Sequence, residues 1–185
     1  NVKSTIVKSI FILTLIALLC PGCDKGSFDF NNPDVTGFVR QLENGTYNQY
    51  EYTEDGERLW TKMPAFQKKD IPELISLAKE TGLISPCDHF PVNPISSMWP
   101  FRVVDGRECI MLGEYLLWCA EAVIEGKDFA SLNPVLYNKD YPNDQRLDAA
   151  EIMAVRKLYQ EWWDEYGHQA DPEKPPLEGT VYIWR

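Results

Sequence analysis

The most reactive side chains of the sequence are a cysteine and a histidine that are separated by one residue. Cys87, Asp88 and His89 are consecutive, and an imidazole beside a thiol could lower the pKa of the thiol and make it a nucleophile. Neighbours in sequence seldom point at one another, however, and the members of a catalytic set are usually distant along the chain. We therefore interpret this segment as a loop with a capping aspartate and assign no catalytic residue.

Carboxylates gather in two segments, residues 51–57 and 140–151. A glycan hydrolase needs two carboxyl groups that converge to about 5–10 Å, and spacing along the chain does not show convergence. The second segment lacks the central glycine of a calcium-binding EF-hand loop and contains Pro142. We predict no metal site and no cofactor, and keep a carboxylate-dependent glycan hydrolase as an alternative function.

Aromatic residues are more abundant than a core of this size requires, with six tryptophans and nine tyrosines. Exposed indole and phenol rings can stack on sugars or anchor a protein partner. We take four tryptophans as candidate contacts for a ligand or partner: Trp60, Trp99, Trp162 and Trp163. The alternative interpretation of these rings is packing within the core.

The N-terminal segment has the layout of an export signal. Lys3 and Lys8 precede an uncharged, almost wholly apolar run over residues 10–20, which is shorter than the roughly 20 residues needed to span a membrane. Residues 18–23 (Leu-Leu-Cys-Pro-Gly-Cys) resemble the bacterial lipobox. We predict a signal peptide over residues 1–22, acylation of Cys23 (by palmitate or a similar chain) and a tether over residues 23–31. An anchor at Cys20 and a cleaved signal without lipid are the alternatives.

The net charge of −10 excludes a nucleic-acid binder, because such a protein needs surplus positive charge to neutralise phosphates. An acidic domain is also not attracted to an anionic membrane surface. We therefore expect the lipid to supply the attachment, and predict an exported protein anchored to the cell envelope at the outer membrane. Both the periplasmic and the surface face stay open.

The spacing of apolar residues predicts four helices, over residues 32–45, 70–82, 108–125 and 147–166. The third is apolar on most sides and is expected at the centre. Residues 46–63 have no regular pattern, Asp105-Gly106 is a hairpin signal, and residues 180–185 suit a short strand or a strap. We predict one mainly α domain over residues 32–185, built of packed helix pairs like an α-solenoid, with at most a minor β-hairpin or C-terminal strand.

Export would place the cysteines of the domain in an oxidising compartment, where disulfides persist. On a helix over residues 108–125, Cys109 and Cys119 would lie about 15 Å apart along the axis, whereas a disulfide needs Cα atoms within about 7 Å. Cys87–Cys109 and Cys87–Cys119 remain, and the first is favoured because Cys109 starts the predicted helix. Three reduced thiols are the alternative.

Residues 70–78, 93–97, 112–119 and 131–136, together with the lipobox, resemble an uncharacterised lipoprotein family of Bacteroidota type, a domain of unknown function. The resemblance covers residues 32–166 and implies a helical, HEAT-like fold, but no activity and no catalytic residues. We accordingly expect a non-enzymatic binding or assembly module with a protein or glycan partner. The hydrolase and a structural accessory subunit are the alternatives.

Overall fold

The computed structural model describes residues 28–80, 82–84, 90–96, 102–142, 145–170, 172 and 174–185. The predicted signal peptide and the predicted lipidated Cys23 lie outside these residues. Cys87, Asp88, His89 and Trp99 also lie outside them.

The described residues form an α/β mixture, with 35% helix and 16% strand, so the expectation of a mainly α, HEAT-like solenoid is wrong. The helices are α1 (Val35–Glu43), the 3-10 helix η1 (Lys68–Asp70), α2 (Ile71–Leu77), α3 (Leu112–Ile124) and α4 (Ala149–Tyr166). The strands are β1 (Tyr50–Tyr52), β2 (Arg58–Thr61), β3 (Leu83–Ile84), β4 (Arg102–Val104), β5 (Arg107–Met111), β6 (Leu136–Asn138) and β7 (Tyr182–Trp184). Strands this short give no periodic signal in a sequence.

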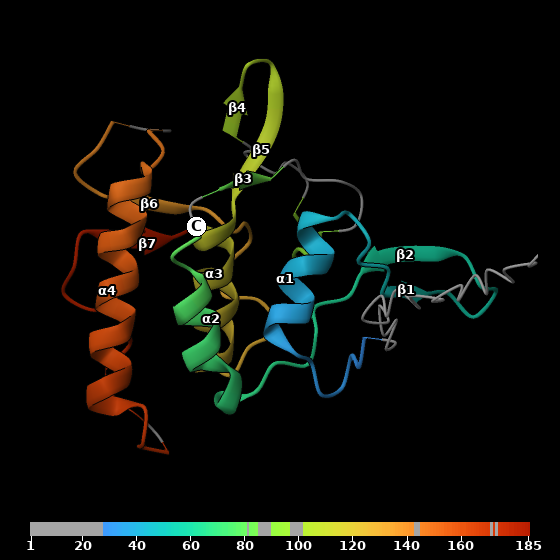
Figure 1. Ribbon diagram of the computed structural model, residues 1–185, viewed down its shortest axis with the longest axis horizontal. Coiled ribbons are helices and arrows are strands. Elements are labelled where there is room, and N and C mark those ends of the chain that lie inside the picture. Colours follow the sequence, from blue (N-terminus) through green and yellow to red (C-terminus); the bar gives the residue numbers. More distant parts are fainter. Residues whose placement is uncertain are drawn as a thin grey trace, which may run out of the picture.

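Three small antiparallel sheets lie around the helices, in the orders β1-β2, β3-β5-β4 and β6-β7 (Figure 1). The β6-β7 pair joins the last residues of the chain to the segment after α3, with Tyr137 opposite Ile183. The C-terminal strand expected from the sequence is therefore present, and it pairs with a segment more than 40 residues earlier.

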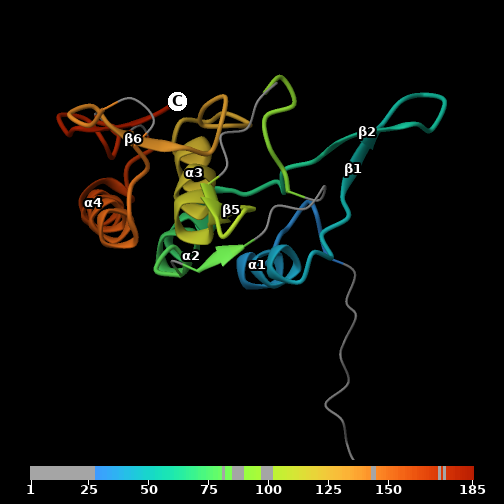
Figure 2. The same cartoon turned by 90° about the horizontal axis from the view of Figure 1, so that it is seen from above.

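Helix α3 is the centre of the molecule, as its apolar sequence predicts. Every residue from Leu112 to Ala122 is buried, and α3 contacts α2, α4 and β5. Figure 2 shows α3 between α4 on one side and the segment that carries α1 on the other.

The expected start of this helix at residue 108 is wrong, because residues 107–111 form β5. Strand β5 pairs with β4 through a tight turn in which Asp105 and Gly106 both have positive φ, 51° and 74°. Two such residues favour a two-residue hairpin turn of the type that matches strand twist. The hairpin signal is confirmed, and it removes Cys109 from the helix start and places it in a strand.

Helices α2 and α3 approach closely where α2 ends and α3 begins. A Cβ atom on Gly113 would lie 2.3 Å from the carbonyl oxygen of Ala78, and the Gly113 amide donates a hydrogen bond to the carbonyl oxygen of Glu80 at 2.8 Å. Only glycine fits at this position. The contact follows the end of α2 at Leu77, short of the expected end at Gly82.

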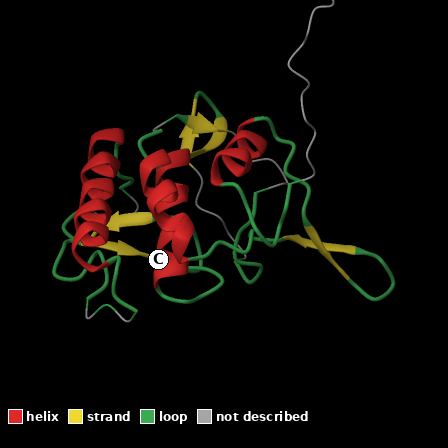
Figure 3. Ribbon diagram, turned by 60° about the horizontal axis from the view of Figure 1, so that its bottom comes forward, coloured by secondary structure: helices red, strands yellow, loops and turns green. Residues whose placement is uncertain are grey.

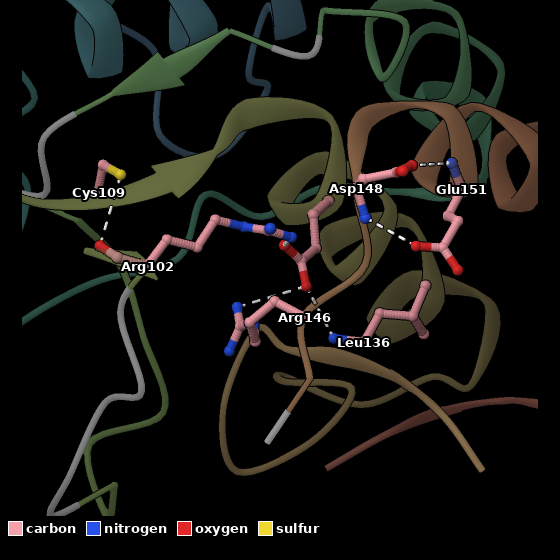
Figure 4. Close-up of polar contacts among 7 residues, drawn as sticks. Arg102, Cys109, Leu136, Arg146, Asp148 and Glu151 are labelled. Atoms are coloured by element: carbon pink, nitrogen blue, oxygen red, sulfur yellow. Dashed lines mark hydrogen bonds and ion pairs between the residues drawn. The ribbon is translucent and has the colours of Figure 1, made fainter. Parts of the chain in front are cut away.

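A fully buried carboxylate, Glu114, lies in the first turn of α3. Its Oε2 atom is 2.8 Å from Nη2 of Arg102, its Oε1 atom is 3.5 Å from Nη2 of Arg146, and Oε1 also accepts the amide hydrogen of Leu136 at 2.9 Å. Figure 4 shows the two guanidinium groups and the Leu136 amide converging from three segments of the chain. Burial lowers the pKa of Arg146, and the negative charge of Glu114 opposes that shift.

Replacement of Glu114 by alanine is expected to lower the free energy of unfolding by about 3–5 kcal/mol, because the largely buried guanidinium groups of Arg102 and Arg146 would both lose the carboxylate that pairs with them. Urea denaturation followed by circular dichroism measures the loss. The matched control is Glu161→Ala, since Glu161 forms an exposed ion pair with Lys157 on α4 and should cost less than about 1 kcal/mol. Equal effects of the two substitutions would contradict a stabilising role for the Glu114 cluster.

Candidate binding site

Strands β1 and β2 with their turn (residues 50–61, called the arm) extend away from the helices, as Figures 1 and 3 show. The sequence pattern over residues 46–63 did not predict this hairpin. A two-stranded hairpin is marginally stable by itself, and the body secures this one at its base. The buried Tyr47 donates its hydroxyl hydrogen to the carbonyl oxygen of Lys62 at 2.6 Å, and the Lys62 amide donates to the carbonyl oxygen of Gln49 at 2.9 Å.

A β-bulge in the arm determines which side chains face the body. Tyr50 pairs with Thr61 and Tyr52 pairs with Arg58, so β2 has one more residue than β1 over this stretch. Paired residues point to the same face, and the two residues between Arg58 and Thr61 therefore both point to the opposite face. These residues are Leu59 and Trp60, whose exposed fractions are 46% and 43%.

A cavity of about 360 Å³ lies where the arm joins the body; we call it the hairpin pocket. Trp60 reaches it from the arm, and three further aromatic rings line it: Phe30, Phe66 and Phe129. The remaining apolar lining comes from residues 63–65 and from Cys119, Ala122 and Val123 of α3. A rigid central helix therefore supports one side of the pocket, and the arm forms another.

The charged residues of the hairpin pocket are of both signs: Glu51, Lys62, Lys127 and Asp128. Lys62 Nζ is 3.1 Å from Glu51 Oε2 and 4.8 Å from the centroid of the Phe30 ring. Lys127 Nζ is 2.8 Å from Glu125 Oε2, and this hydrogen bond raises the pKa of Lys127. Two cations and two anions leave the pocket with no net charge.

The thiol of Cys119 is the reactive group of the pocket lining. Cys119 is buried, and its Sγ atom is 3.9 Å from Sδ of Met63. Burial raises the pKa of the thiol well above its ordinary value, so the thiol stays protonated at neutral pH. A protonated thiol is a poor nucleophile.

Within the described part of the chain, the other predicted tryptophans do not join Trp60 at the pocket. Trp162 is buried in α4, with Nε1 donating to the carbonyl oxygen of Lys174 at 2.5 Å, and Trp163 is half-buried against the core. Cys109 and Cys119 are buried, and among the described residues neither forms a disulfide. Cys109 lies in β5, with Sγ 3.4 Å from the carbonyl oxygen of Arg102. Its pairing with Cys87 stays a prediction, because Cys87 lies outside the described residues.

The carboxylate segments seen in the sequence have separate roles. Glu54, Asp55 and Glu57 are exposed in the turn region of the arm, while Asp148 and Glu151 cap the start of α4 by exchanging side-chain and backbone hydrogen bonds (Figure 4). Among the residues that the structure describes, no group of three or more histidine, cysteine or carboxylate side chains could hold a metal ion.

A second buried carboxylate, Glu121, ends a chain of hydrogen bonds. The Tyr159 hydroxyl donates to Glu121 Oε2 at 2.6 Å and accepts from Trp184 Nε1 at 2.8 Å. Burial raises the pKa of Glu121 to about 7, and the hydrogen bond from Tyr159 acts in the opposite direction. Glu121 lines a cavity of about 300 Å³ together with Lys139, Glu178 and residues of β7. This network holds the C-terminal strand against α3 and α4.

Sequence reasoning identified Trp60 from its residue type alone. It missed Phe30, Phe66 and Phe129, which are spread over a hundred residues and share no motif. The bulge between Leu59 and Trp60 also had no sequence signal, because the strands of the arm have three and four residues.

The fold and the pocket together define a class: a small α/β domain around one buried helix, with an aromatic-lined cavity beneath a projecting hairpin. The chain belongs to the DUF4943 family, a domain of unknown function, which matches residues 29–185. The expectation of a family without a known activity is thus confirmed, and the match extends to Arg185. No curated protein and no solved structure matches the chain.

No helix within the described part of the chain combines the length and the apolar character that crossing a membrane requires.

Replacement of Glu121 by glutamine is expected to remove one source of pH dependence. The pKa of Glu121 rises from the ordinary 4.5 to about 7 in the folded protein, so the folded state binds more protons between these pH values. The free energy of unfolding therefore decreases as the pH rises through that window. Relative to Glu121→Gln, the wild-type protein should lose about 2–3 kcal/mol between pH 5 and pH 8.

Urea titrations at both pH values measure this difference. Glu165→Gln is the control, because Glu165 is an exposed residue of α4 and its replacement should leave the pH dependence of the free energy of unfolding unchanged. Parallel pH profiles of wild type and Glu121→Gln would show that Glu121 does not take up a proton on folding.

Proposed function

We propose that this protein is a non-enzymatic binding module of the cell envelope, anchored by a lipid on Cys23, and that the hairpin pocket is its binding site. The observation that carries the proposal is the placement of Trp60. This large ring lines the cavity from the arm and is 43% exposed. Large exposed aromatic rings beside a cavity are typical of recognition sites.

The chemistry of the described residues favours binding over hydrolysis. The two carboxylates buried in α3, Glu114 and Glu121, are seven residues apart, which places them about 10 Å apart along the helix axis. Glu114 is bound by two arginines and Glu121 by Tyr159. A carboxylate pair for glycoside hydrolysis must instead converge on one scissile bond with a free acid and a free base or nucleophile.

The proposed location rests on the N-terminal sequence. Residues 18–23 resemble the lipobox, and the family match begins at residue 29, so a lipidated Cys23 would be joined to the domain by a short tether. Such a lipoprotein suits the outer membrane of a Bacteroidota-type envelope. Stable attachment would come from several acyl chains, since the acidic domain is not attracted to anionic lipid.

The replacement Trp60→Ala is expected to weaken binding to isolated cell envelopes of the source organism about tenfold or more, because the largest exposed ring of the pocket is removed. Fluorescently labelled protein carrying Cys23→Ser, so that no lipid contributes, is mixed with envelopes over a concentration series and sedimented. Ile95→Ala is the matched control, since Ile95 is 77% exposed and lines neither cavity described above. Equal retention of Trp60→Ala and the parent protein would refute the hairpin pocket as the site.

The replacement Cys23→Ser in the full chain is expected to abolish acylation and move the protein from the membrane to the soluble fraction. Metabolic labelling with radioactive palmitate and fractionation of a host that processes lipoproteins measure both effects. Cys20→Ser is the control and should stay acylated. Loss of the label in Cys20→Ser, with retention in Cys23→Ser, would assign the anchor to Cys20 instead.

A further inference from the structure

We infer that the ligand of the hairpin pocket is a neutral carbohydrate, a short segment of a glycan chain. The inference rests on the proposed binding function and names the chemical class of its ligand. Three properties of the pocket carry it: aromatic rings in its lining, charged lining groups that sum to zero, and an exposed apolar side chain that lies on the arm beyond the cavity.

The lining contains aromatic rings of the kind that a sugar contacts. Trp60 stands on the arm side and Phe129 follows α3, and both line the same cavity. One face of a sugar ring is made of C–H groups, which pack on an aromatic ring, while its hydroxyl groups project from the edge. An open cavity of about 360 Å³ lies at the lower end of the range for ligand sites, roughly 300–1,000 Å³, and suits one or two such rings.

The charged groups around the cavity match hydroxyl groups better than ions. Lys62 and Lys127 donate hydrogen bonds, while Glu51 and Asp128 accept them, and a hydroxyl group can do both. A charged ligand would have to compete with the Lys62–Glu51 pair, whose atoms are 3.1 Å apart. An acyl chain would desolvate these charges without replacing their hydrogen bonds, which is unfavourable. A neutral polyhydroxyl ligand meets neither penalty.

The arm indicates that the ligand is longer than one ring. The bulge places Leu59 beside Trp60 on the same face, and Leu59 is 46% exposed although it lies outside the pocket lining. The apolar surface thus continues from the pocket along the arm. A chain of sugar rings could follow this surface, whereas a single monosaccharide would leave it uncovered.

The test uses the envelope-retention assay described above, with envelopes pretreated in two ways. Periodate cleaves the vicinal diols of sugars, and proteinase K degrades protein. The Trp60-dependent retention is expected to fall at least tenfold after periodate and to survive proteinase K. It should change less than twofold between low salt and about 1 M salt, where charge interactions are screened within about 3 Å. Trp60→Phe should keep most of the affinity because it retains a ring, and Trp60→Ala should lose it.

The outcomes separate this inference from the proposed function. Trp60-dependent retention that is lost after proteinase K but survives periodate would mean a protein ligand, which overturns the carbohydrate inference and leaves the binding function intact. Retention that falls steeply with salt would mean a charged ligand and also overturns the inference. Retention that does not depend on Trp60 overturns both. Circular dichroism of each variant confirms that loss of binding is not loss of folding.

Discussion

The arrangement of the other elements depends on one interaction, the pairing of the Glu114 carboxylate with Arg102, Arg146 and the Leu136 amide. A buried charge is tolerated only when it is paired and its hydrogen bonds are satisfied. Here the partners come from β4, from β6 and from the loop before α4. The contacts of this one side chain therefore position β4, β6 and the loop before α4 around the first turn of α3. This cluster holds β4 and β6 in place, whereas strands of their length are only marginally stable alone.

Helix α3 also lies between the hairpin pocket and the cavity lined by β7. Cys119, Ala122 and Val123 face the hairpin pocket, whereas Glu121 and Glu125 face the cavity beneath β7. The first side presents apolar groups and a protonated thiol, while the second presents carboxylates engaged with Tyr159 and Lys127. A helix buried all round can therefore support recognition on one side and hold the C-terminal strand on the other, and a rigid support of this kind keeps a binding site in a defined geometry.

Three large side chains of the arm, Tyr52, Leu59 and Trp60, are exposed to water. Large exposed apolar side chains on a projecting hairpin are unfavourable for the isolated molecule and invite association. The exposed acidic residues of its turn region, Glu54, Asp55 and Glu57, reduce pairing between copies of this acidic chain. An apolar face that leads into a cavity, next to a turn that discourages self-association, is consistent with a surface kept open for a ligand.

The sequence by itself determined the elements whose information is local. Apolar spacing located four helices and the central position of α3, and the Asp105-Gly106 pair located a hairpin turn, because each signal lies within a few residues of the element it specifies. The family of unknown function was also recognisable from short segments, and Trp60 from its type. Only the tertiary structure decided how the helices pack, that Glu114 meets Arg102 and Arg146, and that Phe30, Phe66 and Phe129 line one cavity with Trp60. These groupings join residues 6 to about 70 positions apart, and they depend on which surfaces bury one another rather than on any local preference. The solenoid expectation failed for the same reason, since strands of two to five residues are stabilised by their partners and leave little trace in the chain that forms them.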